Sequence, residues 1–249
     1  MLLAINIGNT NISGAIFSSP KRIIKQFVLP TKAYSKTKLV KKLKKSFKIS
    51  DAVICSVVPK LTKVLERDLK LFTGKRPYII GKEVTVPIKN LYQPGQLGQD
   101  RLVNAYSACT LYQTPLVVID SGTAITFDVV SKDKKYLGGL IIPGMEISLK
   151  SLKEKTALLP SIKLCQPKIL IARDTKNSIL SGVVYGYSAL CKEMVIRIKK
   201  YIGKKTLVLG TGGNISLIKK YSGIKIKIDK NLTLKGINLV YVNKIKKRG

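Results

Sequence analysis

The chain has no histidine and no tryptophan, and only 13 of its 249 residues are acidic. Without histidine, a histidine general base and a zinc site with histidine ligands are both excluded. The four cysteines, Cys55, Cys109, Cys165 and Cys191, are widely separated and form no CxxC pair. A cysteine zinc site is therefore excluded as well, and we expect the reducing cytoplasm as the compartment.

Long apolar runs are also missing. No uninterrupted run approaches the roughly 18 residues that a membrane-spanning helix needs. The first six residues lack the basic region of a secretory signal peptide. With 45% hydrophobic residues, the chain is long enough to bury the core of one large domain or of two smaller ones. We expect a folded cytoplasmic protein without a membrane segment.

The charge is strongly unbalanced, with 46 Lys and Arg residues and a net charge of +33. Such a balance raises the possibility of a nucleic-acid-binding protein. However, the lysines are spread along the chain, and the few aromatic residues are not interleaved with them. We interpret the lysines as a solvated surface, and specific nucleic-acid binding is the weaker alternative.

Because acidic residues are scarce, their positions are informative. Asp100, Asp120 and Asp128 lie between Gly98 and Val129, close to glycine turns. Carboxylates beside such turns are better candidates for a functional site than for general surface charge. Asp100 also precedes an expected helix over 102–111, so helix capping is the structural alternative for this residue.

The segment 116–128 organises the rest of the chain. An apolar run ends in Asp120, a turn follows around Gly122, and Ile125, Phe127 and Val129 then alternate with polar residues. This alternation predicts a second strand, whereas the Rossmann and P-loop motifs pass from a strand into a helix. The sequence therefore predicts a β-hairpin with a carboxylate and a hydroxyl, Thr123, near its turn.

The same pattern opens the chain at 2–17. Gly8 matches Gly122, and Asn6 matches Asp120. The two members of each pair are separated by the same number of residues. Two copies of one hairpin indicate two similar domains that face each other across a cleft. Glycine lets the backbone approach closely, so such turns can surround a phosphate with N–H groups.

The remaining segments alternate between helix and strand, which predicts an α/β fold with mixed sheets. We expect one domain over 1–114 and another over 115–249. A glycine-rich loop over 92–101 lies in the first. A long helix over 176–201, preceded by Asp174, and a third glycine turn at 210–213 lie in the second.

These motifs together are similar to those of the type III pantothenate kinases, members of the acetate and sugar kinase/Hsp70/actin superfamily. The resemblance covers nearly the whole chain. The matching segments are 6–12, 97–101, 120–124, 138–144, 156–160, 174–175, 181–182 and 211–213. It implies two duplicated actin-like/ribonuclease H-like domains with mixed sheets, flanking helices and a cleft between them. The first domain would carry the hairpin that binds the ATP phosphates and the substrate loop. The second domain would carry another phosphate hairpin, a loop on the adenosine side and a helix at the dimer interface.

The implied activity is ATP-dependent phosphorylation of pantothenate to 4'-phosphopantothenate, the first step of coenzyme A biosynthesis, by a cytoplasmic homodimer. The resemblance implies that one segment binds the ATP phosphates together with Mg²⁺, and that Thr123 makes a further contact with ATP. The residues of that segment are Asn6, Ile7, Gly8, Asn9, Thr10, Asn11, Ile12 and Ser13. Asp100 would accept the proton. The pantothenate contacts would be Tyr92, Gly98, Gln99, Asp100, Arg101 and Thr175. Asp120 would bind a monovalent cation, K⁺ or NH4⁺.

One position departs from the family pattern, which has Asp where this chain has Asn6. An amide keeps an oxygen acceptor but loses the negative charge that attracts hydrated Mg²⁺. We expect weaker metal binding and slower turnover. Three alternatives stay open: a non-catalytic regulatory or accessory member of the family, a nucleic-acid-binding protein, and a kinase for another sugar or acid.

Overall fold

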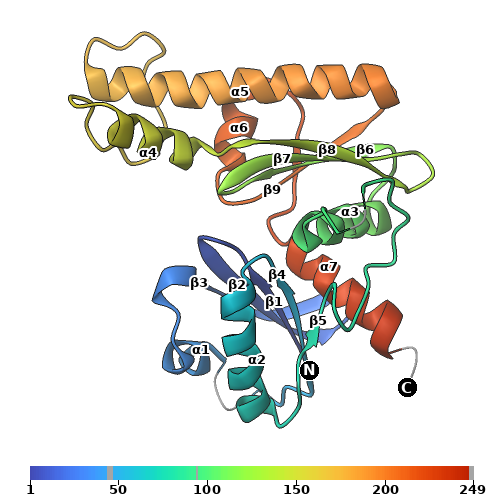
Figure 1. Ribbon diagram of the computed structural model, residues 1–249. Helices are drawn as coiled ribbons and strands as arrows, with labels where there is room; N and C mark the ends of the chain where they lie inside the picture. The colour runs from blue at the N-terminus through green and yellow to red at the C-terminus, as the bar shows by residue number, and fades with distance from the viewer. Residues whose placement is uncertain (44–46, 94, 247–249) are drawn as a thin grey trace. The chain divides into compact units, whose positions relative to one another are not determined.

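The computed structural model describes residues 1–43, 47–93 and 95–246. The chain forms two compact units (Figure 1). One consists of Met1–Leu111 together with Asn231–Gly249, and the other of Tyr112–Lys230. Each unit has its own five-stranded mixed sheet and its own core.

The first sheet has the strand order β3-β2-β1-β4-β5. Its strands are β1 (Leu2–Ile7), β2 (Asn11–Ser19), β3 (Arg22–Pro30), β4 (Asp51–Ser56) and β5 (Tyr78–Ile79). The first three form an antiparallel meander, and β4 and β5 then add in parallel beside β1.

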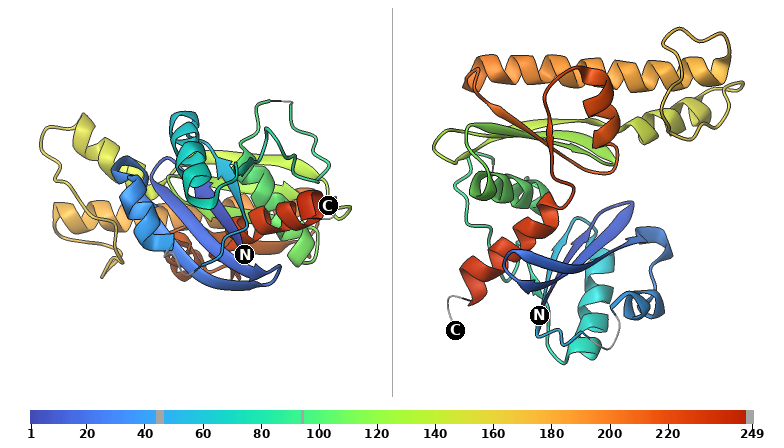
Figure 2. Two further views of the ribbon diagram at one scale, coloured as in Figure 1. Left: turned by 90° about the horizontal axis from the view of Figure 1, so that it is seen from below. Right: turned by 180° about the vertical axis from the view of Figure 1, so that it is seen from behind.

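Helices cover both faces of this sheet, because residues on both faces of β1 are apolar and buried. Leu3, Ile5 and Ile7 pack into a core with α1 (Lys36–Leu43) and α2 (Pro59–Thr73). The other face contacts α3 (Gln99–Leu111) and α7 (Leu232–Tyr241), which pack against each other (Figure 2). A short 3-10 helix (Thr31–Ala33) follows β3, and a π-helical segment (Val242–Lys246) follows α7.

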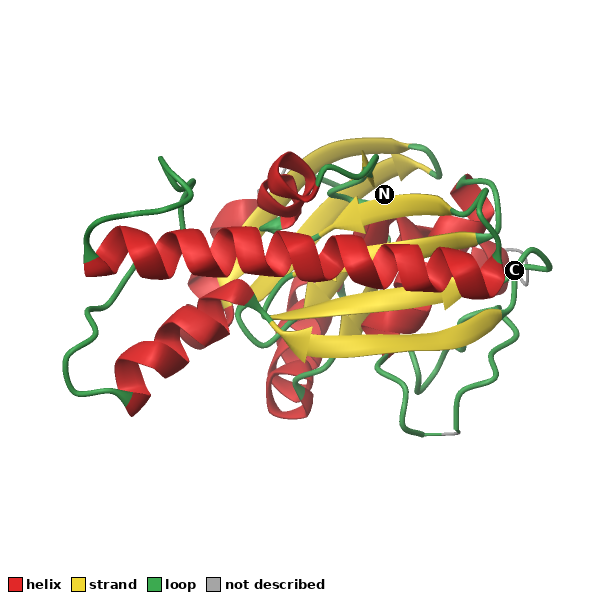
Figure 3. Cartoon of the chain, turned by 90° about the horizontal axis from the view of Figure 1, so that it is seen from above, coloured by secondary structure: helices red, strands yellow, loops and turns green. Residues whose placement is uncertain are grey.

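The second sheet has the order β10-β9-β6-β7-β8. Its strands are β6 (Leu116–Ser121), β7 (Ala124–Val130), β8 (Tyr136–Pro143), β9 (Leu207–Thr211) and β10 (Lys227–Ile228). Its helices are α4 (Met145–Lys155), α5 (Thr175–Ile202) and α6 (Ile215–Ser222). In Figure 3, α5 lies over the sheet and runs roughly along its strands, and its buried residues share a core with β6, β7 and α6.

The duplication predicted from the two hairpins extends to the whole sheets. In each unit an antiparallel meander of three strands is joined by two further strands parallel to the first. Asn6 pairs with Ser13, and Asp120 pairs with Thr126. The two polar residues therefore occupy equivalent places near the ends of equivalent strands.

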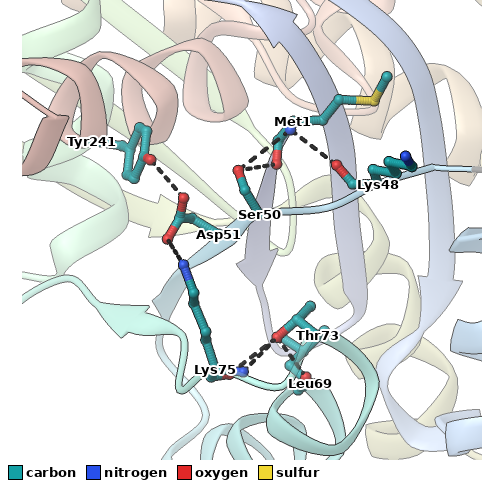
Figure 4. Close-up of polar contacts among 8 residues, drawn as sticks. All are labelled: Met1, Lys48, Ser50, Asp51, Leu69, Thr73, Lys75 and Tyr241. Carbon is teal, nitrogen blue, oxygen red and sulfur yellow. Dashed lines mark hydrogen bonds and ion pairs between the residues drawn. The ribbon is translucent and has the colours of Figure 1, made fainter.

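The observed division differs from the expected one in where the last segment packs. Division at 114/115 would place 231–249 in the second unit, whereas α7 packs on the first sheet. Gly236 permits a close approach to α3, since a Cβ there would lie 2.6 Å from Val103 Cγ1. The Tyr241 hydroxyl donates to Asp51 Oδ2 at 2.9 Å (Figure 4). Burial and hydrogen bonding thus tie this helix to the first core.

Local signals explain several helix boundaries. Pro59 is the first residue of α2, where its missing N–H costs nothing, and Gly74 ends that helix at φ 77°. Asp174 caps α5 by accepting from the Asn177 N–H at 2.9 Å. The expected helix over 102–111 begins earlier, at Gln99, so Asp100 lies in its first turn.

Helix α5 combines length with an apolar composition. By length and hydropathy it could cross a membrane, with a mean hydropathy of 1.3 over an 18-residue window. Counting uninterrupted apolar residues misses this, because polar residues are spaced around the helix. Leu180, Val184 and Val195 are buried in the second core, as they would be in the core helix of a folded unit.

Candidate active site

The first hairpin turn lies between β1 and β2. The Gly8 N–H donates to Asn11 O at 2.9 Å, and a Cβ on residue 8 would lie only 3.2 Å from that oxygen. Ile7 and Ile12 on either side are fully buried, so only their backbone groups can reach a ligand. Asn9 and Thr10 at the turn are exposed. The turn can therefore present backbone N–H groups and small polar side chains to an anion.

A residue that the sequence did not single out holds this turn. The Thr31 hydroxyl donates to Gly8 O at 2.7 Å, and the Thr31 N–H donates to Thr10 O at 2.9 Å. Thr31 follows β3, the strand beside β2. Neither a motif nor a spacing rule pointed to it, because the contact bridges 23 positions of the chain.

Asn6 has an unused acceptor. Its Oδ1 is buried and has no hydrogen-bond partner among the described residues. Buried polar atoms are normally satisfied, so an unsatisfied one can mark the place of a water or an ion. A side-chain oxygen at this strand end fits a hydrated hard cation such as Mg²⁺, which prefers oxygen ligands and retains waters. The amide lacks the charge that would make such binding strong.

Asp100 is linked to the first sheet through Cys55 and α3. Cys55 pairs with Asn6 across β4 and β1 and is fully buried. Burial raises the pKa of the Cys55 thiol well above its ordinary value, and the nearby Asp100 carboxylate raises it further. Helix α3, which carries Asp100 in its first turn, packs against β4, the strand that pairs with β1. Within this unit, Asp100 and Asn6 are thus both linked to Cys55, one by its charge and the other by strand pairing.

The Asp100 carboxyl is partly desolvated. Burial raises its pKa above the ordinary value, while the Arg101 backbone N–H and the positive charge of Arg101 oppose that shift. The Arg101 N–H donates to Asp100 Oδ1 at 2.9 Å. A carboxylate that is less stable in its charged form is a better proton acceptor than an ordinary surface aspartate.

The other residues of the loop over 92–101 assemble around this acid. A Cβ at residue 98 would lie 2.7 Å from Asp100 Oδ1, so glycine leaves room for the carboxylate. The Arg101 guanidinium lies 5.9 Å from the centroid of the Tyr92 ring. The Gln99 side chain packs on Gly81, where a Cβ would lie 2.8 Å from Gln99 Cδ. Residue 94 lies outside the described residues.

The second unit carries the equivalent hairpin. Asp120 and Thr123 flank Gly122, whose N–H donates to Ala124 O at 3.0 Å. Two other glycine turns touch this hairpin. A Cβ at Gly144 would lie 2.3 Å from Thr123 O, and a Cβ at Gly212 would lie 2.5 Å from Asp120 Oδ1. Only glycine permits both approaches, and Gly212 also has φ 89°.

Two helices begin beside this second turn. The Gly144 N–H donates to Thr123 O at 3.0 Å just before α4, and the Asn214 N–H donates to Ser121 O at 3.0 Å just before α6. Neither helix has a side-chain cap at its N-terminus. Helix N-termini carry partial positive charge, so this arrangement suits an anion. Thr175, by contrast, is an exposed residue at the start of α5.

The fold defines a class. Each of the two units has one meander-plus-parallel sheet with a glycine hairpin, which is the actin-like fold. An activator of 2-hydroxyisocaproyl-CoA dehydratase from Clostridium difficile, solved with bound ADPNP, aligns with a TM-score of 0.57 at 11% identity. That alignment covers 99% of this chain and 96% of the other. A Campylobacter jejuni protein described as a Baf family transcriptional activator aligns with a TM-score of 0.62 at 21% identity. That alignment covers 98% of this chain and 99% of the other. At these identities the likeness concerns the fold alone.

The sequence gives the family. The family model for type III pantothenate kinase matches residues 2–197. A type III pantothenate kinase of Finegoldia magna is 36% identical over 252 residues, covering 96% of each chain. The chain belongs to the type III pantothenate kinase family, as the resemblance of its motifs predicted.

Proposed function

We propose that the chain transfers the γ-phosphoryl group of ATP to the primary hydroxyl of pantothenate, forming 4'-phosphopantothenate and ADP. The bond from the γ-phosphorus to the β–γ bridging oxygen breaks, and a bond to the alcohol oxygen forms. The alcohol proton passes to the Asp100 carboxylate. Membership of the type III pantothenate kinase family carries this proposal.

Asp100 suits the role of proton acceptor for two reasons. Its helix packs against β4, the strand that pairs with β1, and its burial makes the charged form less stable and thus more basic. Phosphoryl transfer needs positioning and charge neutralisation more than covalent participation by the protein. One positioned carboxylate and two glycine turns are therefore sufficient for phosphoryl transfer, and histidine is not required.

The ATP phosphates are assigned to the two hairpin turns. In the first unit the contacts come from the segment 6–13, in which Ile7 and Ile12 contribute backbone groups only because their side chains are buried. In the second unit Thr123 and the uncapped starts of α4 and α6 provide donors. Bound Mg²⁺ would neutralise phosphate charge, with Asn6 Oδ1 available to accept from one of its waters.

Pantothenate is assigned to the loop around Asp100. Arg101 would neutralise its carboxylate, Tyr92 would shield that ion pair, and Gly98 and Gln99 would contribute backbone groups. Thr175 would contact the substrate from the start of α5. Asp120 would bind a monovalent cation, K⁺ or NH4⁺, which its position against the Gly212 turn supports.

We also propose a cytoplasmic homodimer. Leu140 on β8 is 40% exposed and Tyr201 on α5 is 85% exposed, and both line one apolar hollow of the second unit, which offers apolar surface to a second copy. All four cysteines are free thiols, which suits a reducing compartment. Light scattering on the purified chain tests the dimer directly, and a monomer at micromolar concentration would contradict it.

The deciding assay follows ADP release with pantothenate, MgATP and KCl, and identifies the product by mass spectrometry. The wild-type chain should form 4'-phosphopantothenate. Asp100→Asn should retain its circular dichroism spectrum and lose turnover by about 10²–10⁴-fold, the range for a lost general base. Absence of pantothenate-dependent release at millimolar ATP would favour the non-catalytic regulator. Phosphorylation of another sugar or acid, but not of pantothenate, would favour the alternative of a kinase for that other substrate.

A further inference from the structure

A basic cavity lies within the second unit, at the end of the sheet opposite the hairpin turn. Its volume is about 840 Å³, and it opens where strands β6, β9 and β10 begin. Pro115, Val208 and Ile226 contribute apolar surface. Six lysines line it: Lys132, Lys199, Lys205, Lys219, Lys225 and Lys227. The described lining includes no aspartate or glutamate.

The six lysines have no carboxylate partner at ion-pair distance among the described residues. Lys199 and Lys219 lie in the last turns of α5 and α6, where they stabilise the helix dipoles. The other four lie in turns or at β10, where no helix dipole explains them. Positive charges gathered around one hollow repel one another, and a bound anion relieves that repulsion.

One of the lining lysines contacts an aromatic ring that is itself hydrogen-bonded. Lys227 Nζ lies 4.7 Å from the centroid of the Tyr112 ring. The Tyr112 hydroxyl donates to Asp229 Oδ2 at 2.7 Å, and burial and this carboxylate raise the pKa of Tyr112 to about 12. This hydrogen bond to Asp229 limits the movement of the Tyr112 ring. Lys227 thus has an aromatic contact in the absence of a ligand.

The cavity is separate from the phosphate hairpin. Leu116 and Ser121 mark the two ends of β6. At the usual rise per residue, a six-residue strand separates its ends by roughly 17 Å. A triphosphate held at the turn around Gly122 thus cannot also fill the cavity.

We infer that this cavity binds a small oligophosphate, a ligand with two or more linked phosphate groups. Lysine is a point charge with three donors and no planar fork, which suits phosphate groups better than the bidentate recognition of a carboxylate. The volume lies in the range of small-molecule sites, about 300–1,000 Å³. Two sources share this chemistry: a free inorganic oligophosphate, and a nucleotide whose organic part would rest on Val208 and Ile226. The inference does not depend on the kinase activity.

The test compares two triple variants of the full-length chain with equal loss of charge. The cavity variant is Lys132→Gln/Lys205→Gln/Lys225→Gln. The control variant is Lys41→Gln/Lys42→Gln/Lys63→Gln, which changes exposed lysines of the first unit. Calorimetric titration at low salt uses inorganic tripolyphosphate in one arm and ADP in the other. We expect the cavity variant to lose about tenfold or more in affinity in at least one arm, and the control less than about twofold.

Each result has a defined meaning. Loss confined to tripolyphosphate identifies a free oligophosphate, and loss in the ADP arm identifies a nucleotide. Equal binding by wild type and both variants would overturn the inference, as would equal losses in both variants, since these would reflect net charge alone. Tighter binding of a 12-base-pair DNA duplex at the same lysines would overturn the ligand class. An unchanged KM for ATP in the cavity variant would show that the catalytic turns are intact.

Discussion

Asp100 Oδ1 occupies the space that a Cβ atom on residue 98 would need, at a distance of 2.7 Å. Gly98 is not in a left-handed conformation. Position 98 therefore requires glycine because a side chain would not fit, and not because of its backbone conformation. The pair explains why a glycine stands two residues before the candidate base. Any side chain at 98 would displace the carboxylate that we propose as proton acceptor.

Gly98→Ala is expected to lower kcat by about 10–100-fold, part of the range for a misplaced general base. The fold should persist, because the clash is with the end of a flexible side chain. Steady-state kinetics and thermal unfolding check both statements. In an Asp100→Asn background, Gly98→Ala should add almost nothing. Independent effects in the double variant would show that Gly98 acts by another route.

Thr31→Val is expected to raise the KM for ATP more than it lowers kcat, because the hydroxyl that fixes Gly8 O is lost while the side-chain shape stays similar. Leaving that acceptor unsatisfied should cost about 1–3 kcal/mol of unfolding free energy, measured in urea. Thr31→Ser keeps the hydroxyl and should restore KM. Equal kinetics in the two variants would remove Thr31 from the phosphate site.

Arg101→Gln is expected to move the acidic limb of the pH profile to higher pH. Burial raises the pKa of Asp100, and the Arg101 charge opposes that shift, so removing the charge raises the pKa further. The base works only when deprotonated, so activity falls as the pH drops through this pKa. The measurement is kcat/KM for pantothenate at saturating MgATP. Lys60→Gln, an exposed control, should leave the limb in place. A limb that moves to lower pH would contradict the assignment.

Asn6→Asp is expected to lower the Mg²⁺ concentration for half-maximal turnover by roughly tenfold, the lower end for outer-shell partners of a metal. The new charge would attract hydrated Mg²⁺ at the buried position of Asn6 Oδ1. Without nucleotide and metal, the same charge should destabilise the fold. Thermal unfolding with and without MgADP gives a readout besides activity. Unchanged kcat and an unchanged Mg²⁺ requirement together would show that the amide is not limiting.

The sequence predicted the hairpins and helices that rest on local patterns. Alternation after Gly8 and after Gly122 specified strands, because neighbouring residues of a strand point to opposite faces of the sheet. Asp174 indicated the start of α5, because an N-cap residue forms its hydrogen bond within the first turn of the helix. The resemblance of the motifs then gave the family. These features depend on residues only a few positions apart.

The tertiary structure decided what depends on distant residues. Only packing shows that α7 covers the first sheet, that Thr31 fixes the Gly8 turn and that α3 packs against β4. The six lysines of the cavity likewise come from separate turns, helices and strands. No local pattern specifies such groupings, because they follow from which buried surfaces fit together. The sequence thus determined the elements and the family, and the packing of those elements determined which side chains meet.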